Sequence, residues 1–509
     1  MVFLSVQAAL LALPLAVRAF DNSRYDNFVA YWGQNSYGAA NPSDSANYQK
    51  SIDFYCNNTS IDVFPVSFLT VANSTGGLPQ IDLANICNPT DNSYFSGTQL
   101  LNCQFMASQI SACQAKGKIL TISLGGQTGS VSFSTDAQAN AFADTIWNVF
   151  LGGSSSTRPF GTAVLDGVDL DIEGGGNAQL ATFVNRLRTH YSGASKKYYV
   201  TAAPQCPYPD GNLQSTLNAA VFDAVYVQFY NNPCGVSTFN TTNFNFGTWD
   251  YWARNLSKSK DTKIFVGAPA SSSAGGGYVS ANDIVTISKS LRNKFPSFGG
   301  VMVWDASQAY NNARFDATVK NALVAAGGTG FTFPACSAPA FQTGGNYPGG
   351  SQVSYNNYIW QARWFASSVP TANIADTGEW QAISACGGAP ISQTSTATSS
   401  TTTSKTSTST TTSKTTTSTT TSTSTTTSKT STSTTSVPTG GSCSGVAAWN
   451  SGVAYTGGQQ VTYGGHLWTA KWWTQADTPG GAAGVWTDNG ACSSAKKVSR
   501  VYGRRPRTD

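Results

Sequence analysis

Charge is scarce in this chain: only 11% of its 509 residues are charged, and the formal net charge is +5. Proteins that bind nucleic acid usually carry a concentrated basic patch, so we expect no nucleic-acid partner. The basic C-terminal stretch, residues 495–509, is short and lacks apolar periodicity, which is typical of a solvated tail. No segment after residue 19 is apolar enough to span a bilayer, so we expect no membrane partner.

The N-terminus and the cysteines both favour secretion. Residues 1–19 hold an apolar run that is too short for a comfortable membrane span and ends in small residues, which predicts a signal peptide. The chain has ten cysteines, an even number that fits an oxidising compartment. Sequons for N-linked glycans begin at Asn57, Asn58, Asn73, Asn240 and Asn255. We therefore expect a secreted protein of the extracellular space or the cell wall.

A Ser/Thr-rich segment separates a long N-terminal part of the chain from a short C-terminal part. Residues 393–436 are almost entirely Ser and Thr with scattered Lys, a composition that cannot bury a core. In a secreted protein this composition is typical of an O-glycosylated stalk, and we assign residues 389–440 to a linker.

An internal repeat lies on both sides of the linker. The stretch YPGGSQVSYNNYIWQARWF, which begins at Tyr347, aligns without a gap with YTGGQQVTYGGHLWTAKWW, which begins at Tyr455. Each copy lies between two cysteines, and domains of about 50 residues usually need a disulfide or a similar cross-link for stability. We predict two small β-rich modules, the first module at residues 333–388 and the second module at residues 441–494. The expected disulfides are Cys336–Cys386 and Cys443–Cys492.

The block that precedes the first module alternates between β-rich runs and helical stretches. The eight runs are FVAYW, IDVFPVSF, KILTISLGG, GVDLDIE, YYVTAAP, AVYVQFY, KIFVGAPA and GGVMVW. Helices are expected between most of them, for example over residues 137–151 and 179–191. This alternation predicts an α/β fold, a parallel (β/α)8 TIM barrel over residues 20–328. A doubly wound open sheet is the alternative fold, but no glycine-rich phosphate turn follows the first run.

Three acids alternate with aliphatic residues in the fourth run, DGVDLDIE, which begins at Asp166. Asp169, Asp171 and Glu173 share one face of the expected strand, and in a barrel that face points into the lumen. Glu173 is nearest the C-terminal end, where the active sites of this fold lie. Clustered buried carboxylates are costly unless they share a proton, which makes Glu173 a candidate general acid. A calcium site or a solvated edge strand is the alternative.

The motif DGVDLDIE resembles the catalytic signature of glycoside hydrolase family 18, Asp-x-x-Asp-x-Asp-x-Glu. SLGG at residues 123–126 resembles the second signature of that family. Three further motifs are similar to those of the plant and fungal class III chitinases: YWGQN at 31–35, AAPQCPYPD at 202–210 and VQFYNNPC at 227–234. The resemblance runs from about Tyr31 to Trp304 and covers all eight runs.

The resemblance implies an endochitinase that cleaves β-1,4-linked N-acetylglucosamine polymers with retention, assisted by the acetamido group of the substrate. It implies that Glu173 protonates the leaving oxygen and that Asp171, supported by Asp169, orients the acetamido group. Tyr230 would hold the acetamido carbonyl. Sugar-binding positions are implied at Tyr31, Gln34, Phe68, Gln228, Asn231 and Trp304. We expect no metal or cofactor, and a monomer whose partner is chitin or another N-acetylglucosamine polymer.

The class III resemblance also implies features of the backbone. Three barrel disulfides are implied, at Cys56–Cys113, Cys87–Cys103 and Cys206–Cys234. Two cis peptide bonds that do not involve proline are implied at Ser67–Phe68 and Trp304–Asp305.

The two modules resemble the small chitin- and cellulose-binding modules of families 5 and 12. Flat aromatic rings stack on pyranose faces, which a polymer presents at regular spacing. The implied binding residues are Trp360 and Trp364 in the first module and Trp468, Trp472 and Trp473 in the second module. The alternative for each ring is packing in the core of its module.

Two other functions remain open for this sequence. One is an endo-β-N-acetylglucosaminidase that acts on N-glycans with the same fold, which the polymer-binding modules disfavour. The other is a chitin lectin without activity, which the intact Glu173, Asp171 and Tyr230 disfavour.

Overall fold

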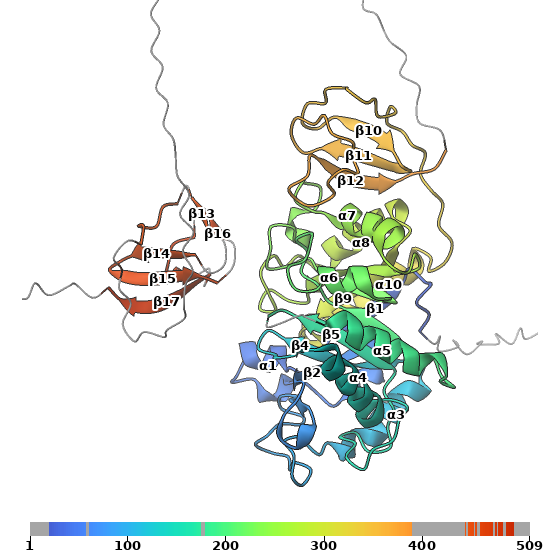
Figure 1. The fold of residues 1–509 in the computed structure, drawn as a ribbon, viewed down its shortest axis with the longest axis vertical. Coiled ribbons are helices and arrows are strands. Elements are labelled where there is room, and N and C mark those ends of the chain that lie inside the picture. Colours follow the sequence, from blue (N-terminus) through green and yellow to red (C-terminus); the bar gives the residue numbers. More distant parts are fainter. Residues whose placement is uncertain are drawn as a thin grey trace, which may run out of the picture. The chain divides into compact units, whose positions relative to one another are not determined.

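The chain forms two compact units in a computed structural model, Met1–Thr396 and Ala397–Asp509. The structure describes residues 20–57, 61–174, 179–388, 443, 446–451, 453–455, 459–471, 474–475, 477–481 and 485–492, which Figure 1 shows in colour. The predicted signal peptide, linker and basic tail lie outside the described residues.

Eight parallel strands form a closed barrel in the first unit. The strands are β1 (Asn27–Ala30), β2 (Val63–Val71), β4 (Ile119–Gly126), β5 (Gly167–Ile172), β6 (Tyr199–Ala202), β7 (Ala224–Gln228), β8 (Lys263–Pro269) and β9 (Phe298–Trp304). The sheet closes because β1 pairs in parallel with both β9 and β2. A short strand, β3 (Gln80–Ile81), pairs antiparallel with β2. The predicted TIM barrel is confirmed, and the open sheet is excluded.

Helices alternate with the barrel strands, as the sequence predicted. They are α1 (Ser36–Ala40), α2 (Ile52–Cys56), α3 (Ala107–Ala115), α4 (Asp136–Phe150), α5 (Leu180–Ser192), α6 (Gln214–Ala219), α7 (Phe246–Tyr251), α8 (Ala281–Lys294), α9 (Ala306–Asn311) and α10 (Phe315–Ala325). The two helices predicted over residues 137–151 and 179–191 are α4 and α5, each within one residue at both ends. Side-chain caps define several starts, for example the capping box of Ser280 and Asp283 on α8.

Two apolar layers lie on opposite sides of the strands. The outer layer, between strands and helices, contains Val168, Leu170 and Ile172 of β5. The inner layer fills the lumen with residues such as Tyr226, Phe265 and Met302. Because side chains alternate along a strand, the acids of β5 must face the lumen, as predicted.

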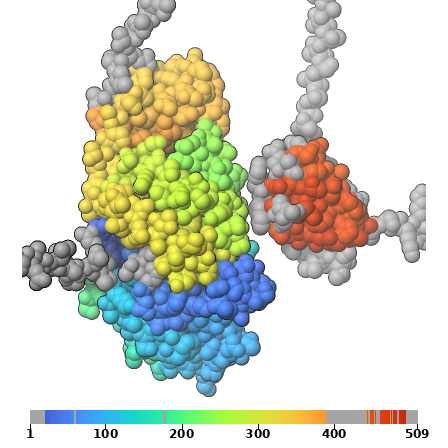
Figure 2. Space-filling model, turned by 180° about the vertical axis from the view of Figure 1, so that it is seen from behind, coloured from blue at the N-terminus to red at the C-terminus, as the bar shows by residue number. Residues whose placement is uncertain are grey.

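The first module is a three-stranded antiparallel sheet that packs against the barrel. Its strands are β10 (Gln352–Tyr355), β11 (Tyr358–Ala362) and β12 (Trp380–Ala385). In the ribbon it lies beside α7 and α8 (Figure 1), and in the space-filling view its orange surface continues the surface of the barrel (Figure 2). Tyr251 of α7 belongs to the same apolar cluster as Trp360 and Trp380 of the module.

The second module has the same local architecture as the first. It contains β13 (Ala454–Tyr455), β14 (Gln460–Tyr463), β15 (His466–Ala470), β16 (Thr474–Gln475) and β17 (Trp486–Ala491). Strands β14, β15 and β17 form a three-stranded antiparallel sheet like that of the first module. Trp360 and Trp468 each donate their indole N–H to the backbone oxygen five residues earlier. The internal repeat therefore reflects a shared fold.

All five disulfides predicted from the sequence are present. They are Cys56–Cys113, Cys87–Cys103, Cys206–Cys234, Cys336–Cys386 and Cys443–Cys492. Among the described residues, no helix has the length and apolar character that crossing a membrane requires.

Candidate active site

A cavity of about 400 Å³ opens at the carboxyl ends of the barrel strands. Its walls are residues at or beyond the carboxyl ends of β1, β2, β4, β5, β7, β8 and β9. The lining residues are Gln34, Phe68, Thr70, Gly125, Gly126, Gln127, Thr128, Glu173, Gln228, Tyr230, Asn231, Ala274 and Trp304. Glu173 and six other predicted catalytic and sugar-binding positions therefore line one cavity, although they come from distant parts of the chain. The six are Gln34, Phe68, Gln228, Tyr230, Asn231 and Trp304.

Asp169 lies at the base of the site and is fully buried. Its carboxylate accepts hydrogen bonds from Thr201 Oγ1 at 2.6 Å and from Tyr31 OH and Ser123 Oγ, each at 2.7 Å. Burial raises the pKa of Asp169, and the three hydroxyl donors counteract the rise. Asp169 therefore supports the residues above it and is not placed to contact a substrate.

Asp171 and Glu173 form a hydrogen-bonded pair above Asp169. Burial raises the pKa of Asp171 well above its usual range, and the charges of Glu173 and Asp169 raise it further. Burial also raises the pKa of Glu173, although hydrogen bonds from Gln228 and Asp171 oppose the shift. Two carboxyls that share a hydrogen bond in a buried site titrate together, so the pair retains one proton where isolated carboxyls are ionised.

Gln228, at the end of β7, fixes the orientation of this pair. Its Nε2 donates to Asp171 Oδ1 at 3.0 Å and to the backbone oxygen of Ala203 at 3.0 Å. Tyr230 lies two residues further along and also lines the cavity. Burial and the two nearby acids raise the pKa of Tyr230 well above its usual value, so its hydroxyl remains a hydrogen-bond donor.

Aromatic rings form one wall of the cavity. The rings of Phe68 and Trp304 are stacked, with centroids 5.9 Å apart and an angle of 15° between their planes. Tyr31 packs against both rings from below. The peptide bonds Ser67–Phe68 and Trp304–Asp305 are cis, as the resemblance implied.

The glycines of the SLGG motif end β4 where no side chain would fit. Gly126 has a φ of +76°, and a Cβ atom there would lie 2.6 Å from the ring of Phe68. Gly125 has a φ of +107°, and a Cβ atom there would lie 2.3 Å from the backbone oxygen of Asp171. Both positions therefore require glycine so that β4 can approach the acids and the aromatic wall.

The similarity to known proteins covers the barrel residues that form this site. Residues 27–283, which include the motif DGVDLDIE and seven of the eight barrel strands, match the model of Glycosyl hydrolases family 18. The chain belongs to family 18. Residues 448–487, within the second module, match the model of Carbohydrate-binding module family 5/12.

Fungal relatives share this family 18 region. Chitinase 2 of Rhizopus oligosporus is 46% identical over 328 residues, which are 64% of this chain and 57% of the relative. The Endochitinase of Saccharomyces cerevisiae is 41% identical over 302 residues, 59% of this chain and 50% of the relative. Endochitinase 33 of Trichoderma harzianum is 38% identical over 335 residues, 63% of this chain and 99% of the relative. The chain thus matches only about half the length of the first two relatives.

Besides Asp169 and Asp171, two further positions of the family 18 resemblance are absent from the cavity lining. Tyr31 is buried, and its hydroxyl is bonded to Asp169, so it supports the site from beneath and does not line it. Asp166 belongs to the signature but accepts from Gln114, Lys196 and the backbone N–H of Leu120. Asp166 therefore joins β5 to its neighbours and has no part in the cavity.

One acid near the site had no predicted role. Asp210 accepts from the backbone N–H groups of Gln205, Asn212 and Leu213, and its charge raises the pKa of both Asp171 and Glu173. The sequence contains Asp210 within AAPQCPYPD, but a loop has no periodicity that would place its carboxyl beside the pair.

The tryptophans of the modules differ in exposure. Trp360 is 1% exposed and lies in the core of the first module, so the prediction that its ring binds polysaccharide is corrected. Trp364 is 48% exposed and the adjacent Phe365 is 58% exposed. Trp468 is half-buried against the core of the second module. Trp472 and Trp473 lie outside the described residues.

No group of three or more His, Cys, Asp or Glu residues that could hold a metal ion occurs within the described parts of the chain.

Proposed function

We propose that this protein is a chitinase that hydrolyses β-1,4-linked N-acetylglucosamine polymers within the chain and with retention of configuration. The observation that carries the proposal is the pair of carboxyls at the carboxyl end of β5, the buried Asp171 and the partly buried Glu173, beside Gln228 and Tyr230 of the cavity. Among the described lining residues Glu173 is the only acid. A retaining enzyme with two catalytic carboxylates would need a second one across the cavity.

The cavity instead suits a mechanism in which the substrate supplies the nucleophile. The acetamido oxygen bonds to the anomeric carbon of its own sugar, the glycosidic C–O bond breaks, and the leaving oxygen takes the proton of Glu173. Water then adds to the anomeric carbon, gives its proton to Glu173 and reopens the oxazolinium ring. The anomeric carbon is attacked twice, so its configuration is retained.

The pair Asp171–Glu173 can deliver its shared proton at the right place. When an acetamido N–H donates to Asp171, it favours the ionised form of that carboxyl. The shared proton then resides on Glu173, which is the general acid. The ionised Asp171 stabilises the positive oxazolinium, and the Tyr230 hydroxyl donates to the acetamido oxygen.

The fungal relatives are named chitinases and endochitinases, which supports this substrate class. In the second module, Trp468, Trp472 and Trp473 would hold chitin by ring stacking, and the match to carbohydrate-binding modules supports this role. In the first module, the exposed Trp364 would contribute a further contact. The five disulfides and the fungal relatives support a secreted protein, and we propose that it acts as a monomer.

Release of reducing ends from colloidal chitin tests this function. We expect release from chitin and none from a high-mannose glycoprotein, and Glu173→Gln should abolish it. Release from the glycoprotein alone would indicate the N-glycan enzyme. Adsorption to chitin without any release would indicate a lectin.

A further inference from the structure

We propose that Asp376 of the first module is a positioning residue for the catalytic pair, because it clamps a loop that is bonded to Gln228 of the active site. This clamped loop comprises residues 204–213, between β6 and α6. The inference rests on the proposed function for its kinetic consequences, but the clamp itself can be tested without any activity.

The first module is fixed on the barrel along α7. Tyr358, at the start of β11, donates to the buried Asp250 of α7 at 2.6 Å. Arg363, just past the end of β11, donates to the backbone oxygen of Thr242 at 2.5 Å. Thr242 lies in the loop that follows β7, so β11 runs from the body of α7 towards the end of the barrel that carries the cavity.

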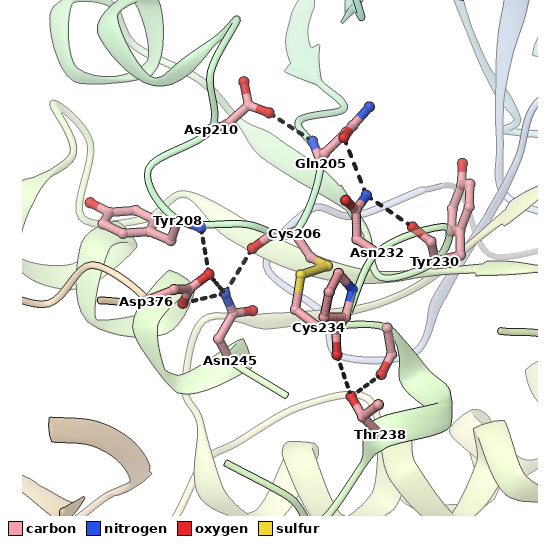
Figure 3. The surroundings of a disulfide bond; sticks show 12 residues. Gln205, Cys206, Tyr208, Asp210, Tyr230, Asn232, Cys234, Thr238, Asn245 and Asp376 are labelled. Atoms are coloured by element: carbon pink, nitrogen blue, oxygen red, sulfur yellow. Dashed lines mark hydrogen bonds between the residues drawn. A yellow bond between two sulfur atoms is a disulfide. The ribbon is translucent and has the colours of Figure 1, made fainter. Parts of the chain in front are cut away.

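Asp376 then reaches the clamped loop from the segment between β11 and β12. Its backbone N–H donates to Tyr208 O at 2.9 Å, and its carboxylate accepts from Tyr208 N at 2.8 Å. The same carboxylate accepts from Asn245 Nδ2 at 2.8 and 3.0 Å, and Asn245 Nδ2 also donates to Cys206 O at 2.7 Å (Figure 3). Asp376 thus holds the loop both directly and through Asn245.

The clamped loop leads directly to residues of the cavity. Gln205 accepts from Asn232 Nδ2, which also donates to the backbone oxygen of Tyr230 (Figure 3). The disulfide Cys206–Cys234 ties the loop to the segment after β7. The loop is therefore tied to the segment after β7, which carries the cavity residues Tyr230 and Asn231.

The loop also sets the position of Gln228. Cys206 N donates to Gln228 O at 3.2 Å, and Gln228 N donates to Pro204 O at 2.8 Å. Gln228 in turn donates to Asp171, as described above. A displacement of the loop would therefore move the amide that orients the catalytic pair, and would move the charge of Asp210 as well.

The requirement at position 376 is for a carboxylate. Its two oxygens accept from the backbone of Tyr208 and from the amide of Asn245, and Arg363 Nη2 lies 3.6 Å from Oδ1. Removing the carboxylate leaves the N–H of Tyr208 without this partner at the interface between module and barrel. We therefore expect the loop to move more readily once this acceptor is gone.

The test compares Asp376→Ala and Asp376→Asn with the control Glu379→Gln. Glu379 lies in the same module, but its carboxylate accepts from Ser367 and Ser368 of that module and not from the clamped loop. In the full-length protein, hydrogen exchange of peptides covering residues 204–213 should become faster in Asp376→Ala and should stay unchanged in Glu379→Gln. Asp376→Asn keeps one acceptor oxygen, and its exchange should be intermediate.

On soluble chito-oligosaccharides, kcat/KM of Asp376→Ala should fall about 10- to 100-fold, as expected when catalytic groups are misplaced. A loss of folded protein alone would lower kcat and leave KM and the pH profile unchanged. A loosened clamp should raise KM and shift the alkaline limb of the profile, because Gln228 and Asp210 both act on the pair. Should Asp376→Ala not fold, the same measurements on Asp376→Asn decide.

Unchanged exchange in residues 204–213 together with unchanged KM and pH profile would overturn the inference. Altered exchange without any kinetic change would also overturn the positioning role. If the wild-type protein cleaves no chito-oligosaccharide, the proposed function fails, while the exchange experiment still tests the clamp.

Discussion

At the residue scale, the chemistry depends on how burial alters the two carboxyls that β5 brings together. Asp171 is almost fully buried, and Glu173 is partly buried at the cavity. Burial raises the pKa of each, and their hydrogen bond lets one proton serve both. A carboxylic acid that keeps its proton at pH values above the usual pKa range of carboxyls can act as a general acid in mildly acidic solution.

Glu173→Gln should abolish turnover and preserve the affinity for chito-oligosaccharides. The amide retains the shape of the side chain but cannot supply the proton, and general acid catalysis contributes roughly 10²–10⁴-fold. Single-turnover kinetics and calorimetric titration measure the two effects, with Glu379→Gln as the control. Activity within about tenfold of the wild type would contradict the role of Glu173.

Asp171→Asn should have opposite effects on activity and stability. The raised pKa of Asp171 means that the folded state binds more protons than the unfolded state between the two pKa values. Asp171 therefore contributes its full stability at pH values below its pKa in the unfolded state. That contribution is lost as the pH rises through its pKa in the folded state. Because Asn stays neutral and can donate to Glu173 in the same way, the variant should gain in melting temperature relative to the wild type from pH 4 to pH 7. Its kcat should be severely reduced, and an equal Tm difference at both pH values would contradict this account.

At the scale of single elements, each strand end places a different part of the cavity. The end of β4 provides two glycines that let the strand approach Asp171 and Phe68 closely, and the end of β5 provides Glu173. The ends of β7 and β9 provide Gln228 and Trp304. Parallel strands of a closed barrel end at the same rim, so residues of different runs converge there.

Gly126→Ala should reduce activity while the barrel remains folded. The added methyl group would lie 2.6 Å from Phe68 at a φ of +76°, so the aromatic wall or the end of β4 must shift. We expect kcat/KM to fall by at least about tenfold, since misplacements near 1 Å can cost 100-fold. Gly193→Ala is the matched control, because nothing lies within 4 Å of a Cβ atom there. Equal kinetics for the two variants would show that the close approach is unimportant.

Trp360 and Trp364 of the first module should respond differently to alanine. Removing the buried Trp360 ring leaves a cavity in the module, which typically costs about 3–5 kcal/mol and should lower the melting temperature. Removing the exposed Trp364 ring should leave melting unchanged and weaken adsorption to chitin. Thermal melts and binding isotherms on crystalline chitin separate the two, and unaltered adsorption of Trp364→Ala would remove it from the binding surface.

At the scale of the whole molecule, the proposed chemistry and the retention on the polymer belong to different parts of the chain. All described residues of the cavity lie in the barrel, whereas the match to a carbohydrate-binding module lies beyond the Ser/Thr-rich linker. The first module differs from the second in this respect, because it packs on the barrel and bonds to it.

Removal of residues 389–509 should leave the hydrolysis of soluble chito-oligosaccharides nearly unchanged. Hydrolysis of crystalline chitin should fall, because the second module no longer keeps the barrel at a high effective concentration near the surface. Parallel rate measurements on the two substrates check this separation. An equal loss on both substrates would show that the second module also serves the chemistry.

The sequence by itself determined the elements of this protein and the acids of its site. Eight β-rich runs, the alternation in DGVDLDIE and the aligned repeat are local patterns, and local periodicity specifies strands, faces and modules. Position along β5 therefore sufficed to predict that Asp169, Asp171 and Glu173 face the lumen and that Glu173 lies at its mouth.

Only the tertiary structure decided what depends on contacts between distant residues. Trp360 and Trp364 belong to the same aromatic motif of the first module. The packing of the module against α7 buries Trp360, whereas Trp364 stays exposed. Tyr31 lies beneath the cavity because its hydroxyl meets Asp169, 138 residues away. Asp376 meets Tyr208 across 168 residues. Such contacts arise from the way that elements pack, and a pattern of neighbouring residues holds no information about them.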